Sequence, residues 1–251
     1  MAERLLAEEG ENKGSYKRLC TAPAIQDLRS DTMPTLMTPA LLPEKKTRNV
    51  IRVIPFIPRK EGLPTLYPFD GIGIYDRERF IRLNGFDPYI KNFFWQLMDF
   101  GFRSSLWGEE IATTQLVKLS YEGAVPQEDS TADGDYMRFF LKNLSPVFKG
   151  DYAHIPFRRF PGYFKLRGEF FTAWEEFSAA RTWVKTNRYR FTSDARTMAE
   201  RFSSFEIGGG FGTGGAGGTS GADDNNDSDE RDSSFQEGLS QQDDSSQENE
   251  K

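Results

Sequence analysis

The centre of the chain, from Tyr67 to Ile111, reads YPFDGIGIYDRERFIRLNGFDPYIKNFFWQLMDFGFRSSLWGEEI. Within it, Gly71 to Tyr75 is short and apolar, which favours a strand, and Arg77 to Leu83 can form a helix that Gly85 ends. Phe93 to Trp107 places its apolar side chains at the spacing of a second helix. The order of strand, helix, turn and helix predicts an α/β fold for this stretch.

Further strand candidates lie on both sides of this centre. Arg18 to Ile25 and Asn49 to Ile57 are apolar, and Pro55 places the later half of the second one at an edge or bend. Ala112 to Tyr121 alternates with the period of two that a strand has. Asp27 to Pro43 carries three prolines and is predicted to be an irregular connection. Together these segments predict a mixed sheet with flanking helices.

The two ends of the chain differ in character from the centre. Ala2 to Glu9 is predicted to be a short helix, and Glu128 to Gly134 is predicted to be a polar loop. Thr192 or Ser193 is predicted to cap the helix that starts at Ser193. The residues after Gly208 are rich in Gly and then in Asp, Ser and Gln, a composition typical of disorder. Three more helices are predicted at Asp135 to Leu144, Glu169 to Val184 and Ser193 to Phe205. We therefore divide the chain into an α/β half domain (1–125), a helical aromatic and basic extension (126–207), and a disordered linker with an acidic tail (208–251).

The net charge of −6 hides an asymmetry along the chain. Asp223 to Lys251 holds eleven acidic and two basic residues, a net −9, so the preceding residues sum to +3. A single cysteine, Cys20, excludes an internal disulfide, and a single histidine, His154, excludes a His pair for zinc. The sequence also predicts no transmembrane segment and no signal peptide. We expect a cytoplasmic protein, with peripheral contact with a membrane left open.

Four motifs of the centre stand in an order that a known family shares. They are a small-residue strand at Gly71 to Ile74, an arginine-rich helix start at Arg77 to Phe80, a Gly-Phe-Asp turn at Gly85 to Asp87, and a helix with an acid and an arginine at Gln96 to Arg103. In this order the stretch resembles the second half of the catalytic domain of family 2 glycosyltransferases. The resemblance implies a partial α/β fold of the GT-A type, limited to the acceptor-side half.

This resemblance implies a reaction and a set of site residues. The family transfers a sugar from a nucleotide-sugar donor to a hydroxyl of a carbohydrate or lipid-linked acceptor, which requires a base to remove the hydroxyl proton. The Glu-Asp-x-Asp pattern of the family falls on Gln96, Leu97 and Asp99, so the position of the usual base holds leucine. Asp99 is the nearest substitute as the catalytic residue; otherwise the site is inactive or uses Glu109 or Glu110. The candidate substrate-binding residues are Asp87, Trp95, Gln96, Arg103 and Trp107.

Each of these candidates also has a structural explanation. Asp99 can pair with Arg103 one helical turn later, and Asp87 can tighten the turn in which it lies. Trp95 and Trp107 lie at helical spacing, where aromatic side chains commonly pack in a core. The sequence leaves both explanations open for each residue.

The resemblance also implies parts that we do not find in the sequence. Family members carry a nucleotide-binding half and an Asp-x-Asp metal motif before the region seen here, and Met1 to Gly14 resembles the helix that follows that motif. We therefore expect no cofactor in this chain itself. Either a complementing subunit supplies the donor site, with Mg²⁺ or Mn²⁺ where one is used, or the chain is a truncated reading frame or a non-catalytic remnant. The Asp-x-Asp match at Asp133 to Asp135 lies in the polar loop and is predicted to be a solvated turn, not a metal site.

A binding module is the alternative class of function. Tyr136 to Ile207 holds thirteen basic and seven acidic residues, a net +6, and Phe157 to Phe171 (FRRFPGYFKLRGEFF) interleaves basic with aromatic side chains. Such a surface can bind single-stranded nucleic acid or another anionic polymer, and the acidic tail would then compete for it. The structural explanation is that the aromatic rings are buried while the arginines reach solvent.

Overall fold

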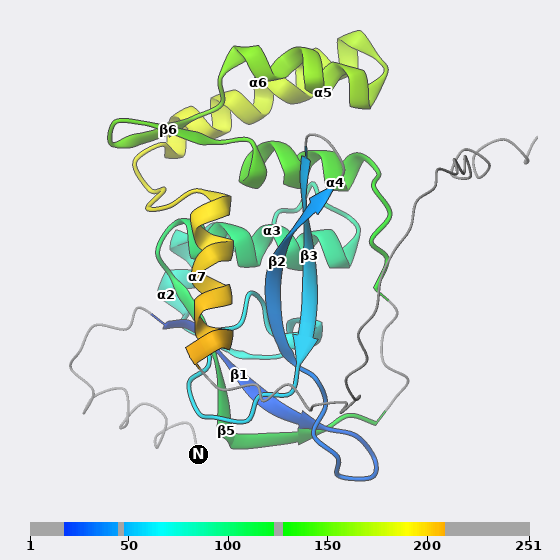
Figure 1. The fold of residues 1–251 in the computed structure, drawn as a ribbon, viewed down its shortest axis with the longest axis vertical. Coiled ribbons are helices and arrows are strands. Elements are labelled where there is room, and N and C mark those ends of the chain that lie inside the picture. Colours follow the sequence, from blue (N-terminus) through cyan, green and yellow to red (C-terminus); the bar gives the residue numbers. More distant parts are fainter. Residues whose placement is uncertain (1–17, 45–47, 123–127, 209–251) are drawn as a thin grey trace, which may run out of the picture. The chain divides into compact units, whose positions relative to one another are not determined.

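The computed structural model describes residues 18–44, 48–122 and 128–208 and has a mixed α/β fold (Figure 1). Three strands form one sheet in the order β4-β1-β5, and β2-β3 and β6-β7 form two separate pairs. The strands are β1 (Arg18–Gln26), β2 (Leu36–Glu44), β3 (Arg48–Phe56), β4 (Ile74–Tyr75), β5 (Glu110–Ser120), β6 (Val147–Lys149) and β7 (Tyr152–His154). The helices are α2 (Arg77–Arg82), α3 (Phe93–Leu106), α4 (Gly134–Phe139), α5 (Phe160–Arg167), α6 (Phe170–Asn187) and α7 (Ala195–Gly208), with short turns η1 (Phe69–Gly71), η2 (Phe140–Leu144) and η3 (Phe157–Arg159). The predicted α/β class is confirmed.

The sheet is built on β1, which is apolar and almost wholly buried. It runs parallel to β5, from Arg18 opposite Glu110 to Gln26 opposite Ser120, and antiparallel to β4. A strand buried on both faces needs a continuous apolar sequence, which RLCTAPAIQ provides. The strand predicted at Arg18 to Ile25 is therefore confirmed.

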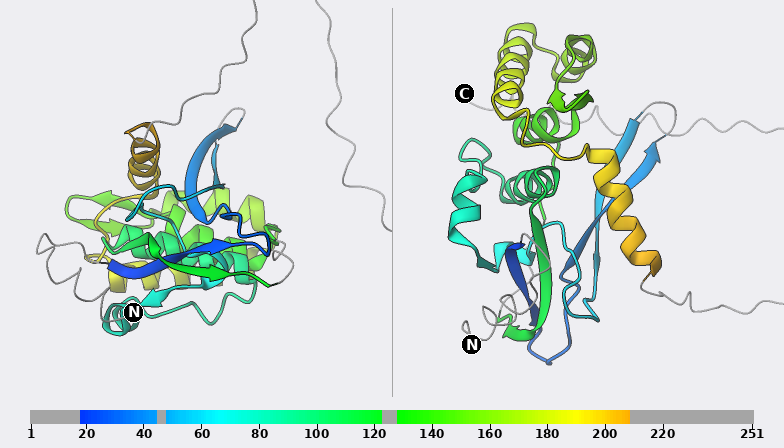
Figure 2. Two further views of the ribbon diagram at one scale, coloured as in Figure 1. Left: turned by 90° about the horizontal axis from the view of Figure 1, so that it is seen from below. Right: turned by 90° about the vertical axis from the view of Figure 1, so that its left-hand side faces the viewer.

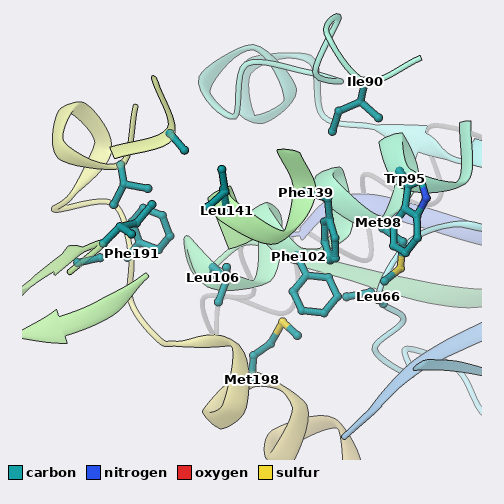
Figure 3. Close-up of a cluster of buried hydrophobic side chains, with 14 of the residues drawn as sticks. Leu66, Ile90, Trp95, Met98, Phe102, Leu106, Phe139, Leu141, Phe191 and Met198 are labelled. Carbon is teal, nitrogen blue, oxygen red and sulfur yellow. The ribbon is translucent and has the colours of Figure 1, made fainter. Parts of the chain in front are cut away.

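Helix α3 lies at the centre of the core. The side chain of Asn92 caps its first turn by accepting a hydrogen bond from the backbone N–H of Trp95 at 3.3 Å. Side chains of α3, α4 and α7 meet in Figure 3, where the rings of Phe102 and Phe139 lie 5.1 Å apart and Met198 points toward them. Helix α7 also lies beside β2 (Figure 2). The core thus joins the helical extension to the helix that carries the candidate site residues.

Residues 36–44 correct one sequence-based expectation. The segment predicted to be irregular contains β2, which pairs antiparallel with β3 from Leu36 opposite Phe56 to Glu44 opposite Arg48. In the part of the chain that the structure describes, β2 has a partner on one side only. Proline is tolerated in such a strand because its missing N–H can face away from the partner.

Other local predictions were partly right. The strand predicted at Gly71 to Tyr75 shrinks to β4, because Asp70 and Gly71 adopt positive φ angles of 51° and 69° in the turn before it. Helix α7 is capped by Asp194, which accepts a hydrogen bond from Thr197 N at 2.8 Å, and not by the residues predicted. Helix α5 and the β6-β7 hairpin were not predicted at all.

Some predictions concern residues outside those described. The helix predicted at Ala2 to Glu9 and the disorder predicted beyond residue 208 belong to this group. The contacts divide the chain into Met1–Phe211 and Gly212–Lys251, and every described residue belongs to the first unit. Among the described helices, none combines the length and the apolar character needed to cross a membrane.

The close approach of α3 to Leu66 generates a prediction. A Cβ at Gly101 would overlap the backbone carbonyl oxygen of Leu66, whereas a Cβ at Gly162 in α5 would meet nothing within 4 Å. We expect Gly101→Ala to lower the free energy of unfolding by about 1–3 kcal/mol, because the backbone must shift to relieve the overlap. Gly162→Ala is the control and should change it by less than about 1 kcal/mol, toward greater stability. Urea unfolding measures both, and equal effects would contradict the close contact.

Candidate functional site

Asp99 is buried in the middle of α3 and both of its oxygens accept hydrogen bonds. Oδ2 accepts from Nη2 of Arg103 at 2.8 Å and from its Nε at 3.2 Å. Oδ1 accepts from Nζ of Lys142 and from Nδ2 of Asn143, each at 2.8 Å. The carboxylate has no exposed surface, so its partners are protein groups and not solvent.

Lys142 joins this carboxylate to a second one. Its ammonium also donates to Oδ2 of Asp87 at 2.7 Å, and Arg138 donates from Nε to the same oxygen at 2.8 Å. Asp87 further accepts a hydrogen bond from Tyr89 N at 3.0 Å, which tightens the Gly-Phe-Asp turn as the structural explanation predicted. We call Asp87, Asp99, Arg103 and Lys142 the buried charge network; its two carboxylates are balanced by two buried cations.

Arg103 ties this network to the end of α2. Its guanidinium donates from Nη1 to the carbonyl oxygen of Leu83 and from Nη2 to that of Gly85, the latter at 2.7 Å. These carbonyls belong to the segment that ends α2, where Asn84 and Gly85 adopt φ angles of 68° and 55°. A planar fork with five donors suits this arrangement of one carboxylate and two carbonyls.

The charges of the network determine the protonation of its carboxyl groups. Burial alone would raise the pKa of Asp87, but the nearby Lys142 and the hydrogen bond from Arg138 outweigh it and lower the pKa to about 2. For Asp99, burial is likewise outweighed by Arg103 and Lys142, and its pKa lies below the ordinary value. A general base needs an accessible oxygen and a pKa near the working pH. The pairing with Arg103 is therefore confirmed, while the catalytic role of Asp99 stays a prediction that this geometry does not favour.

The other predicted substrate-binding residues are engaged with the protein. Trp95 is 6% exposed, stacks on Phe139 with 5.4 Å between ring centroids, and donates from Nε1 to the carbonyl oxygen of Thr131 at 2.7 Å. Trp107 stacks on Trp183 at 5.8 Å. The explanation by core packing is thus the one that the structure supports for both tryptophans.

Gln96, the remaining predicted residue, is half-buried at the start of α3. Its Nε2 donates to the carbonyl oxygens of Asp87 and Ile90, each at 3.2 Å. Since these carbonyls lie in and just after the Gly-Phe-Asp turn, Gln96 fastens the turn to the helix.

A pocket of about 460 Å³ opens at the amino-terminal end of α3. Leu97, at the position where the resemblance places the base, contributes to its wall. The wall combines aromatic rings with carboxyl groups and is formed by Tyr67, Phe69, Asp70, Lys91, Asn92, Phe93, Phe94, Leu97, Glu128, Asp129, Asp133 and Asp135. We call it the acidic pocket, because five carboxyl groups face one lysine.

The described residues of the loop before α4 are fastened to the start of α3. Asn92 donates from Nδ2 to the carbonyl oxygen of Asp129 at 3.0 Å. Oδ2 of Asp135 accepts hydrogen bonds from the N–H groups of Lys91 and Asn92 at 2.8 and 2.6 Å. Asp133 caps α4 by accepting from the N–H groups of Asp135 and Tyr136. Both acids of the Asp-x-Asp match thus have structural partners, and no cluster of three or more potential metal-ligating side chains occurs among the described residues.

Glu128 has an exposed side chain that lines the acidic pocket, and its pKa is raised. Burial raises its pKa, against the smaller lowering by a hydrogen bond from Tyr67, whose hydroxyl lies 3.5 Å from Oε1. The two other carboxylates proposed from the sequence do not line this pocket. Glu109 pairs with Arg79 at 2.9 Å, and Glu110 lies at the start of β5, where burial raises its pKa against the lowering by Arg18 and Arg201. Sequence reasoning missed Glu128 because nothing in a polar loop indicates which acid faces a pocket.

The aromatic residues of the extension are partly packed. Phe160 and Tyr163 are buried, while Phe170 and Phe171 are 49% and 85% exposed. The explanation by burial therefore holds for some of these rings only. The binding-module alternative stays a prediction, and its competing tail lies outside the described residues.

No protein-family model and no curated protein matches the sequence. The likeness to family 2 glycosyltransferases therefore rests on the motifs alone.

The buried charge network predicts the effect of removing its bridging cation. Lys142→Gln would leave two buried carboxylates with one fully buried cation, so we expect the free energy of unfolding to fall by about 3–5 kcal/mol. Lys118→Gln, in an exposed position on β5, should change it by less than about 0.5 kcal/mol. Denaturant unfolding followed by tryptophan fluorescence measures both. Similar values for the two variants would show that Lys142 does not balance the network.

The lowered pKa of Asp87 predicts a dependence of stability on pH. Its pKa is about 2 in the folded protein against an ordinary 3.8, so its contribution is present above pH 3.8 and is lost as the pH falls through 2. The full contribution is about 2 kcal/mol. Urea unfolding between about pH 5 and about pH 2.5 should show a shallower loss of stability for Asp87→Asn than for the unmodified protein. Parallel pH profiles would contradict the assignment.

Proposed function

We propose that this chain provides the acceptor-binding side of a glycosyltransferase of the GT-A type, and that the acidic pocket holds the acceptor sugar. The observation that carries the proposal is the pocket itself: it opens at the start of α3, and its wall includes Leu97, where the resemblance places the base. Aromatic faces and carboxyl groups in one pocket suit a saccharide, because C–H groups pack on rings while hydroxyls donate to carboxylates.

The charge of the pocket supports the acceptor over the donor as its occupant. Five carboxyl groups and one lysine repel a diphosphate, which a nucleotide-sugar carries. A neutral polyhydroxyl compound has no such conflict. The donor would then occupy a site provided by another polypeptide segment or subunit, with Mg²⁺ or Mn²⁺ where the reaction uses one.

Glu128 is our candidate for the proton acceptor. Its raised pKa brings a carboxylate closer to the range useful for removing a hydroxyl proton, and it lines the same pocket as Leu97. In the proposed reaction, Glu128 takes the proton as the acceptor oxygen attacks the anomeric carbon, and the diphosphate leaves from the opposite face. Asp70, whose Oδ2 accepts a hydrogen bond from the Tyr121 hydroxyl at 3.0 Å, would bind a hydroxyl and keep the sugar in place.

Titration with neutral saccharides tests the binding step. We expect the purified chain to bind at least one mono- or disaccharide, observed by saturation-transfer NMR, and to bind UDP and GDP more weakly at this pocket. Phe93→Ala should weaken saccharide binding about fivefold or more, because Phe93 is 47% exposed in the pocket wall. Phe148→Ala, 37% exposed on β6 and outside the pocket, is the matched control. A folded protein that binds no saccharide would remove the proposal.

The role of Glu128 is tested separately from binding. Glu128→Gln preserves the size of the side chain, so saccharide binding should remain within about threefold, since a single hydrogen-bond acceptor is altered. Sugar transfer, assayed with the donor-binding component supplied, should fall by a factor of about 100 or more. Transfer at an unchanged rate would assign the proton acceptor to another group.

A further inference from the structure

A second pocket, of about 410 Å³, lies on the helical extension between β7 and one face of α6. It is separate from the acidic pocket, shares no residue with it, and does not depend on the proposed function. Its wall consists of Tyr152, Ala153, His154, Ile155, Ser178, Arg181, Thr182, Lys185 and Arg188. We call it the β7-α6 pocket.

The cations of this pocket belong to one side of α6 and to Arg188, the helical residue that follows it. Arg181, Lys185 and Arg188 are spaced by four and three residues, which places them on the same helical face. No carboxyl group lines the pocket, and no ion pair involves these three side chains among the described residues. Three positive charges thus line one hollow whose described wall holds no carboxylate.

Two of these cations are held in position by aromatic rings. The guanidinium of Arg188 lies 5.3 Å from the ring centroid of Tyr152 and 4.6 Å from that of Tyr189. Arg181 lies 5.5 Å from the Phe157 ring and donates from Nε to the carbonyl oxygen of Ile155 at 3.1 Å. Because rings and a backbone carbonyl fix these side chains, less conformational entropy is lost when they bind an anion.

Neutral polar groups complete the wall between the cations. Ser178 and Thr182 lie one turn apart on this face of α6, and the Thr182 hydroxyl donates to the carbonyl oxygen of Ser178 at 2.9 Å. Nδ1 of His154 is buried and has no hydrogen-bond partner among the described groups. Because this nitrogen has almost no accessible surface, the contacts open to a ligand are those of the cations.

We propose that the β7-α6 pocket binds a phosphate group carried by a larger organic molecule. Three cations on one face suit a phosphate, which carries about two negative charges and three acceptor oxygens, better than a single carboxylate. The pocket exceeds the volume of a bare phosphate, and the ring of Tyr152 offers its organic part an apolar wall. A phosphorylated sugar and a phosphorylated lipid headgroup both have this chemistry.

Calorimetric titration of the full chain with inorganic pyrophosphate tests the site. Lys185 makes no hydrogen bond or ion pair with any described residue, so Lys185→Gln should fold normally and yet bind pyrophosphate about tenfold more weakly. Lys165→Gln removes an exposed lysine of α5 outside the pocket and is the matched control; its affinity should remain within about twofold, since distant exposed charges are screened. A second variant, Arg181→Gln, should also lose affinity about tenfold.

The source of the phosphate is determined by two further probes. Glucose 6-phosphate represents a soluble ligand, and vesicles of phosphatidylcholine with phosphatidic acid represent a lipid headgroup. Binding of either probe that depends on Lys185 and not on Lys165 supports the site and identifies its source. The proposal is overturned if the folded protein binds neither probe nor pyrophosphate, or if both lysine variants lose affinity equally. A single-stranded oligonucleotide that binds when these probes do not would instead assign the surface to nucleic acid.

Discussion

The ammonium of Lys142, held between two buried carboxylates, is the contact on which the rest of the structure depends. It lies 2.7 Å from Oδ2 of Asp87 and 2.8 Å from Oδ1 of Asp99, and these three residues come from η2, the Gly-Phe-Asp turn and α3. Isolated buried charges are very unfavourable, so the segments are stable together only in an arrangement that brings all three charges into contact. Arg103 completes the balance and extends it to the backbone that ends α2. The centre of the chain and its helical extension are thereby folded as one unit.

The buried charge network also explains why Asp99 of α3 is poorly suited to act as a general base. Asp99 is the acid nearest to Leu97, where the resemblance places the base, but four hydrogen bonds and complete burial use both of its oxygens. The same cations that balance its charge also lower its pKa. A residue that organises the fold this strongly cannot also exchange protons with a substrate without disrupting its partners. For this reason the proposed reaction assigns the proton acceptor to Glu128, an acid with few partners.

Local sequence patterns predicted several of the helices and strands, whereas the arrangement of the candidate site depends on long-range contacts. Helix α3 and strand β5 follow from periodicity, and the Asp99–Arg103 pair follows from a spacing of four residues on a helix. The contact of Lys142 with Asp99 joins residues 43 apart, and no local pattern contains it. The position of Glu128 depends on a loop fastened by Asn92 and Trp95 to α3. Strand β2 was missed for a similar reason. Its prolines argue against a strand, and only the structure shows that β2 pairs with β3 on one side, where prolines are tolerated.

These connections affect how variants in the network should be interpreted. The acidic pocket takes part of its wall from the start of α3 and part from Asp133 and Asp135 at the start of α4. The two helices are joined through the network, because Asp87 contacts Arg138 of α4 and Lys142 of η2, and Lys142 contacts Asp99 of α3. A substitution at Asp87 or Asp99 would therefore move the pocket wall, and it would impair the proposed saccharide binding without touching the ligand. Loss of function at these positions would not identify a catalytic residue. A variant such as Glu128→Gln, whose side chain has one long hydrogen bond of 3.5 Å to the described residues, separates the proposed chemistry from folding.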